Sequence, residues 1–146
     1  MSSFAQKIMG VVMALGLVAL LSLPAFAATE APKSATAYFV NLQDGDAIQN
    51  GATIKFGSTG LTIEPAGVIR PGAGHFHLLI DTTLSAAQMN RPIPNDNQHL
   101  HFGKGQTETI LNLTPGPHTL QLVMGDGAHV PHIPPVMSKV ITVTVK

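Results

Sequence analysis

The chain has 146 residues, and its eight Lys and Arg side chains balance its eight Asp and Glu side chains. It has no basic excess of the kind that binds nucleic-acid phosphates and no polybasic segment for anionic lipids. It also has no cysteine, which excludes thiolate nucleophiles, iron–sulfur clusters, cysteine zinc sites and blue-copper centres.

The N-terminal 27 residues have the three-part layout of a secretory signal peptide. Lys7 is followed by an uncharged apolar stretch over 8–21, and a Leu-Pro-Ala-Phe-Ala segment then ends in an A-x-A cleavage pattern. The stretch is shorter than the roughly 20 residues of a membrane span, so we expect cleavage after Ala27 and no stable span afterwards. This predicts a periplasmic or secreted protein with a short mobile leader over 28–35 and one domain over 36–146.

The first part of this domain alternates short strand patterns with turn signals. Apolar residues alternate from Tyr38 to Leu42, and an Asp-Gly-Asp turn follows them. Ile54 and Phe56 share one face of a second predicted strand. Residues 64–74 contain two prolines and three glycines, which predicts a loop.

The next two strand patterns each carry a His-x-His pair. Every second residue over 76–80 is apolar and faces the predicted core, whereas His75 and His77 lie on the opposite side of the strand. Prolines limit residues 84–98 to an irregular stretch with at most one helical turn. In the short pattern over 99–102, the leucine and the phenylalanine face the core and both histidines point away.

The last part of the chain contains three further strand patterns. Residues 107–113 and 118–124 flank a Thr-Pro-Gly-Pro turn, and a loop rich in glycine and proline leads to a final strand over 138–145. About seven short strands and no helix of three turns predict an all-β fold. The most economical arrangement is an immunoglobulin-like antiparallel β-sandwich.

Six of the seven histidines occur as three tight pairs. Neutral imidazole is the commonest protein metal ligand, and three pairs in so short a chain are hard to explain by packing alone. Connections alternate between the two ends of a seven-strand sandwich, which places the three pairs at one end and His118 at the other. We expect His118 to hydrogen-bond the turn before it. The predicted metal-binding residues are His75, His77, His99, His101, His129, His132 and Asp126.

The pattern leaves the number and kind of ions open. Six imidazoles exceed the four ligands of a structural zinc site, so either two ions bind or some histidines orient the ligands. Nitrogen ligands without sulfur suit Cu(II), Zn(II) or Ni(II), and an oxidising exported compartment favours copper, followed by zinc. Asp126 is either a ligand or orienting group, or a cap of the Gly-Asp-Gly turn that contains it.

These features predict an exported, histidine-rich copper or zinc carrier, buffer or chaperone whose partner is the metal ion. No catalytic residue is predicted, because no serine has a nucleophile-elbow context and no phosphate-binding glycine pattern is present. A metal-dependent hydrolase or oxidoreductase would need an open coordination position, which a sequence does not reveal. The remaining alternative is a metal-free ligand-binding or adhesive module of the cell envelope, whose histidines bind an anionic or carbohydrate ligand or sense pH.

The strings HFHLLID, HLHFGKGQTETILNL and PGPHTLQLVMGDGAHVPHIPP together resemble a family of small exported bacterial domains of unknown function. The resemblance covers about residues 72–146. It implies an exported β-sandwich with a histidine-rich site, and it supplies no activity. The residues that match the family pattern are His75, His77, His99, His101, Gly105, Gln106, Thr107, His118, Gly125, Asp126, His129 and His132.

Overall fold

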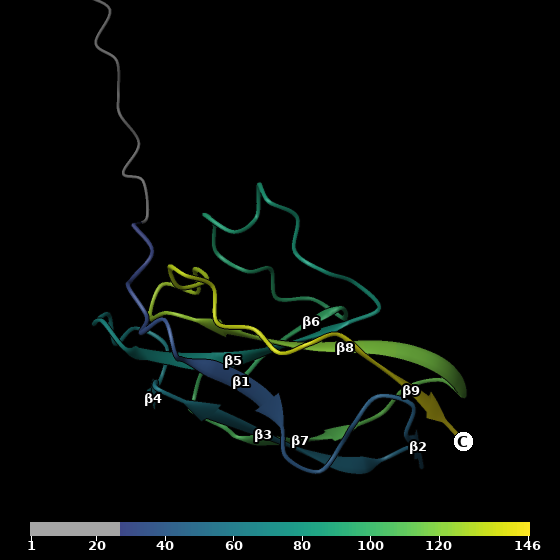
Figure 1. Ribbon diagram of the computed structural model, residues 1–146. Coiled ribbons are helices and arrows are strands. Elements are labelled where there is room, and N and C mark those ends of the chain that lie inside the picture. The colour runs from purple at the N-terminus through teal and green to yellow at the C-terminus, as the bar shows by residue number, and fades with distance from the viewer. Residues whose placement is uncertain (1–26) are drawn as a thin grey trace, which may run out of the picture.

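The structure is a computed structural model that describes residues 27–146, so all but the last residue of the predicted signal peptide lies outside the described residues. Within this range the chain forms nine strands and no helix, and seven of the strands have three or more residues. The strands form two sheets that pack as the all-β sandwich predicted from the sequence (Figure 1). No helix in the described part of the chain has the length and apolar character needed to cross a membrane.

The smaller sheet has the order β1-β3-β7, and both of its pairings are antiparallel. The larger sheet has the order β2-β9-β8-β5-β4, and β6 also pairs with β5. Its long pairings are antiparallel, while the two-residue strands β2 and β4 pair in parallel with β9 and β5. The bounds are β1 Thr36–Phe39, β2 Ala47–Ile48, β3 Ala52–Thr59, β4 Thr62–Ile63, β5 Ala73–Ile80, β6 His99–His101, β7 Glu108–Leu111, β8 Gly116–Gly125 and β9 Ile141–Val145.

The main core lies between the two sheets and contains the apolar faces predicted for most strands. The ring of Phe56 from β3 packs against Phe76 from β5 and against Phe102, with ring centroids 5.4 and 4.9 Å apart. Alternate residues of β8 and β9 complete this core. Burial of each large side chain here contributes about 1.5–3 kcal/mol, which allows a domain without disulfides to be stable.

The alternating apolar residues of the first strand do not all face the core. Ala37 is buried, whereas Tyr38 and Val40 are 43% and 57% exposed. Tyr38 lies opposite Gly57 of β3, and its ring occupies the space where a side chain at that glycine would lie. Of the alternating residues Tyr38, Val40 and Leu42, only Leu42 therefore reaches the main core, and the tyrosine ring covers the glycine outside it.

The outer face of the larger sheet is also covered, which the sequence did not indicate. Leu79, Leu84, Ile93 and Val123 form a second buried apolar cluster there. The long connection between β5 and β6 lies over this face (Figure 1). All eight residues of β5 are consequently buried, including the two histidines that point away from the main core.

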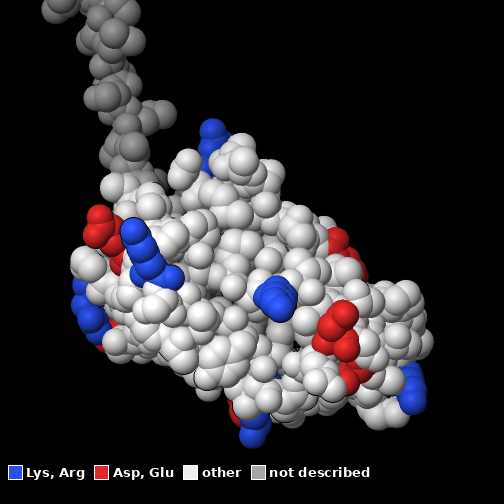
Figure 2. All heavy atoms as spheres, in the orientation of Figure 1, with Lys and Arg blue, Asp and Glu red and all other residues white. Residues whose placement is uncertain are grey.

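Charged side chains are sparse on the face of the molecule seen in Figure 2. Lys and Arg side chains are dispersed among Asp and Glu side chains, and uncharged surface separates them. This face therefore has no single-sign patch of the kind that steers nucleic acid to a protein.

Candidate metal site

Strand pairing brings three histidines together on the outer face of the larger sheet. His77 of β5 lies directly opposite His101 of β6, and His75 lies two residues before His77 on the same face. The Nε2 atom of His75 is 3.2 Å from the Nε2 atom of His77 and 3.2 Å from that of His101. His75 and His77 are fully buried and His101 is half-buried, so the three nitrogens meet beneath the surface.

A fourth imidazole closes the cluster from the loop that follows β8. The ring centroid of His129 is 4.7 Å from that of His101, 5.1 Å from that of His75 and 6.0 Å from that of His77. His129 has a left-handed backbone with φ of 68°, a conformation that is uncommon for a residue with a side chain. The surrounding loop must therefore hold this residue in place over the other three rings.

Two glycines make room for the rings, and neither of them was predicted to belong to the site. A Cβ atom at Gly103 would lie 2.2 Å from Cε1 of His101, and one at Gly125 would lie 2.9 Å from Nε2 of His77. Any side chain at either position would displace an imidazole. Gly125 was among the residues that match the family pattern, and its place at the end of β8 is the signal that could have identified it.

The buried imidazoles are neutral at neutral pH. Burial, followed by the neighbouring rings of His101 and His129, lowers the pKa of His75 to about 4. Burial, followed by the neighbouring ring of His75, lowers the pKa of His77 to about 2. Burial and the ring of His129 also lower the pKa of His101. A neutral imidazole keeps a nitrogen lone pair, which is the form that binds metal ions.

The spacing of the nitrogens suits a single metal ion. One ligand nitrogen from each of His75, His77 and His101 lies within 4.8 Å of the other two, so these histidines could together hold an ion. Two nitrogens bound to one zinc ion at about 2.0–2.1 Å would be roughly 3.3–3.4 Å apart at a tetrahedral angle and roughly 2.8–3.0 Å apart at a right angle. The observed 3.2 Å separations are closer to the tetrahedral value.

His132 lies beside the cluster, outside the group of three nitrogens. Its Nδ1 atom is 2.9 Å from the hydroxyl of Thr29 and 3.3 Å from the carbonyl oxygen of Thr29. Its Nε2 atom is buried without a hydrogen-bond partner among the described residues, and a Cβ atom at Gly74 would lie 2.6 Å from it. The structure therefore anchors this ring to the N-terminal segment and packs it against β5.

His99 is on the same face of the sheet but points to a different partner. It lies opposite Leu79, and its Nδ1 atom donates a hydrogen bond to Oδ1 of Asp96 over 2.8 Å. This hydrogen bond lowers the pKa of the Asp96 carboxyl group. The Nε2 atom of His99 is buried and has no partner in the described part of the chain. The sequence did not indicate Asp96 as the group that orients this imidazole.

Asp126 accepts hydrogen bonds that hold the loop after β8, called the histidine loop because it carries His129 and His132. Its carboxylate accepts hydrogen bonds from the backbone N–H groups of Thr29, Ala128 and Val130, over 2.9–3.0 Å. The side chain is fully buried. Of the two interpretations left open by the sequence, the hydrogen bonds support the turn cap.

His118 is remote from the other six histidines, as predicted. Its Nδ1 atom is 2.7 Å from Oδ2 of Asp81, and its Nε2 atom is 2.9 Å from the carbonyl oxygen of Thr114 in the preceding turn. The predicted hydrogen bond to that turn is therefore confirmed. Both partners are acceptors, and the hydrogen bond to Asp81, followed by the one to Thr114, raises the pKa of His118.

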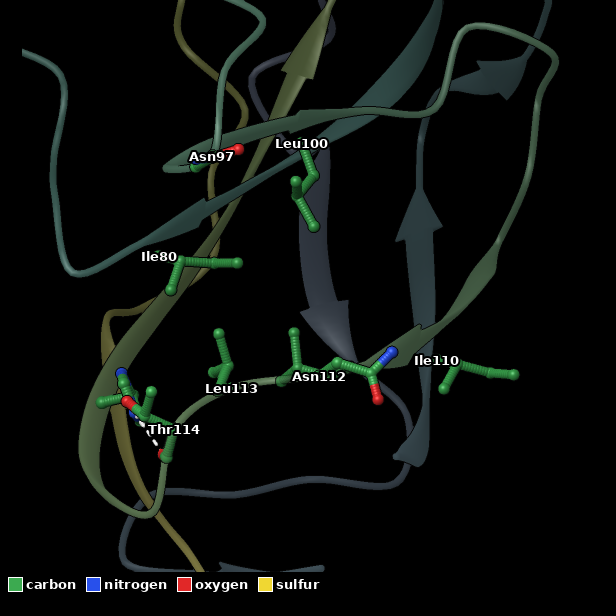
Figure 3. Close-up of a pocket in the computed structure, with 9 residues that line it drawn as sticks. Ile80, Asn97, Leu100, Ile110, Asn112, Leu113 and Thr114 are labelled. Carbon is green, nitrogen blue, oxygen red and sulfur yellow. Dashed lines mark hydrogen bonds between the residues drawn. The ribbon is translucent and has the colours of Figure 1, made fainter. Parts of the chain in front are cut away.

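A groove of about 470 Å³ lies next to His118, between the edges of the two sheets. Figure 3 shows Ile80 and Leu100 from the larger sheet on one side of it, and Asn112 and Leu113, which follow β7, on the other. Its lining is mostly apolar and includes none of the clustered histidines. The groove and the histidine cluster are thus separate features of the molecule.

Comparison with known proteins places this site in a family without assigning it an activity. The search of curated proteins found no match to the chain. A family model described as "Domain of unknown function (DUF4399)" matches residues 54–146, a range that includes all seven histidines and β5 to β9. The match begins before the region that resembled such a family in the sequence and covers more than half of the chain. The protein therefore belongs to the DUF4399 family.

Proposed function

We propose that this protein is an exported metal carrier or buffer that binds one zinc or copper ion through His75, His77 and His101. The observation that carries the proposal is the convergence of three Nε2 atoms, with two separations of 3.2 Å. These separations are within hydrogen-bond range, so the metal-free rings can share a proton, and an ion bound between the nitrogens would displace it. The ring of His129 lies beside this group of nitrogens, with its centroid 4.7 Å from that of His101.

Zinc is the first candidate among the ions that nitrogen ligands bind. The nitrogen spacing corresponds to an angle near tetrahedral at the ion, which zinc adopts in closed four-ligand sites. Cu(II) prefers a tetragonal arrangement with angles near 90°, although the oxidising compartment expected for an exported protein favours copper. A competition titration with both ions ranks them directly.

The burial of the cluster supports carriage or storage. His75 and His77 are fully buried, and the cluster reaches solvent on the side of the half-exposed rings of His101 and His129. The ring of His129 packs against the rings of His75 and His101, which restricts the access of a bulky substrate to an ion held by the three nitrogens. An ion bound in this buried cluster is better placed for uptake and release than for the turnover of such a substrate.

The signal-peptide pattern supports export, since its charged start, apolar stretch and A-x-A end are the features that direct secretion. N-terminal sequencing of the protein recovered from the exported fraction would test this part of the proposal. The expected mature protein begins at Ala28. A chain that stays in the cytoplasm with its N-terminus intact would refute export.

The metal-binding part is tested by titrating the mature, untagged protein with zinc and with copper, each monitored by calorimetry. We expect one ion per chain for the wild type and for His118→Ala, which removes a histidine remote from the cluster. His77→Ala should weaken binding at least tenfold, because it removes a converging nitrogen. Equal affinity for the two variants would refute the assignment.

A further inference from the structure

We propose that Thr29 is a positioning residue for the metal site, and that residues 29–31 form a strap that holds the histidine loop in place. The proposal rests on the proposed metal-binding function. Figure 1 shows the N-terminal segment running beside the loop that follows β8. This part of the chain was predicted to be a mobile leader, but its residues are hydrogen-bonded to the site.

Thr29 contacts the histidine loop through three of its own groups. Its hydroxyl lies 2.9 Å from Nδ1 of His132, and its carbonyl oxygen accepts from the N–H of Ile133 over 3.1 Å. Its N–H donates to Oδ2 of Asp126 over 3.0 Å. Because the Thr29 carbonyl is also 3.3 Å from Nδ1 of His132, this ring is held as the tautomer that carries its proton on Nδ1.

The two residues after Thr29 extend the attachment. The N–H of Ala31 donates to the carbonyl of Ile133 over 3.0 Å, so the strap pairs with the loop on both sides of Glu30. The carbonyl of Glu30 accepts from the N–H of Gly72 over 3.0 Å, and the side chain of Ala31 is buried. These contacts fix the strap between the histidine loop and the segment that leads into β5.

The strap reaches the metal site through Asp126. The second oxygen of this carboxylate accepts from the N–H groups of Ala128 and Val130, which flank His129. The backbone of Asp126 also accepts from the N–H of His129 over 2.8 Å. The carboxylate thus joins Thr29 to the turn in which His129 adopts its left-handed conformation. Loosening the strap would free this turn to relax and draw the fourth imidazole away from the cluster.

The position of the strap fits the predicted cleavage point. Cleavage after Ala27 would leave Ala28 as the single residue before Thr29, so the strap would be the N-terminus of the mature protein. A cut two residues further along would remove Thr29 and its contacts. The contacts of the strap are therefore kept only where the cut leaves Thr29 in the chain.

Thr29→Val tests the strap, because it keeps the side-chain shape and removes the hydroxyl. We expect about a tenfold loss of zinc affinity, because losing the contact with His132 loosens the strap, whose Thr29 N–H holds the turn of His129 through Asp126. Thr36→Val is the matched control, since Thr36 also has a hydroxyl partner, Thr59 at 2.6 Å, in β1. Thr36→Val should bind zinc as the wild type does, and Thr29→Ser should restore wild-type affinity.

Equal zinc affinity for Thr29→Val and Thr36→Val would overturn the strap while leaving metal binding by the wild type intact. If the wild type binds neither zinc nor copper, the proposed function fails, and the strap is tested in the metal-free protein. There the amide protons of Ala31 and Ile133 should exchange slowly, and ¹⁵N spectra should show the Nδ1 proton of His132. Fast exchange of both amides would overturn the strap even if Thr29→Val did not fold.

Discussion

The metal-free protein should lose stability as the pH falls from 7.5 to 5, and the buried histidines set the size of the loss. The pKa of His75 is lowered to about 4 and that of His77 to about 2, from an ordinary value of 6.5. Because the folded-state pKa values are depressed, the unfolded chain takes up protons first. The stabilisation is fully present above pH 6.5 and is lost as the pH decreases below it.

The magnitude follows from proton linkage. In the unfolded state at pH 5, the protonated form of an imidazole with a pKa of 6.5 outnumbers the neutral form by roughly 30 to 1. The same ring in the folded protein remains largely neutral. This difference costs about 2 kcal/mol for each ring, or about 4 kcal/mol for His75 and His77 together. That is a large share of the roughly 5–15 kcal/mol that stabilises a typical domain. His118 acts in the opposite direction over this range, because its pKa is raised.

The assay is urea denaturation of the mature protein in the presence of a chelator, at pH 7.5, 6.0 and 5.0. The loss at pH 6.0 should be about 1 kcal/mol per ring, so the fall in unfolding free energy should steepen toward pH 5. The double variant His75→Leu, His77→Leu keeps buried apolar volume at both positions and serves as the control. It should lose most of this pH dependence.

Two results would refute the reasoning. One is a metal-free wild type with the same unfolding free energy at pH 7.5 and pH 5. The other is a double variant whose stability falls as steeply as that of the wild type, which would place the responsible protons on other groups.

Three further substitutions separate the site from the rest of the fold. Gly103→Ala should weaken zinc binding at least tenfold in calorimetry, because its Cβ would lie 2.2 Å from Cε1 of His101 and displace that ring. Wild-type zinc affinity in this variant would contradict the placement of His101 among the metal ligands. Asp126→Ala should lower the unfolding free energy by about 3 kcal/mol in urea, since it leaves buried N–H groups without an acceptor, and a loss below about 1 kcal/mol would count against that role. His118→Ala should reduce stability by about 1 kcal/mol at pH 6 and by less at pH 9, because the raised pKa stabilises the protonated ring beside Asp81 and this benefit is lost as the pH rises. Zinc affinity should be unchanged in this variant, and a pH-independent stability loss would contradict the ion pair.

Much of the fold follows from the alternation of apolar residues. Phe76 and Ile80 on one face of β5, and the alternate buried residues of β9, lie where their sequence spacing predicts. Spacing does not show which apolar residues of the first strand face the core, because Tyr38 covers Gly57 on the outside. It also gave no indication that the outer face of β5 would be buried, because that depends on how an irregular connection lies over the sheet.

The sequence predicts that the candidate site is made of histidines, but it predicts only in part which histidines belong to it. The His-x-His spacing places His75 and His77 on one face of a strand, and the absence of a strand between β5 and β6 brings His101 opposite. The separation of His99 and His132 from the three converging nitrogens depends on contacts with Asp96 and Thr29, which lie outside the histidine motifs. No spacing rule reveals such partners.

The most direct test of the central claim is the metal content of the mature, untagged protein purified from its exported compartment. It should be measured beside a His75→Ala, His77→Ala variant that is shown to be folded by its circular dichroism spectrum. Our account predicts close to one zinc or copper ion per wild-type chain and none in the variant. A metal-free wild type that also takes up neither ion in titration would contradict it.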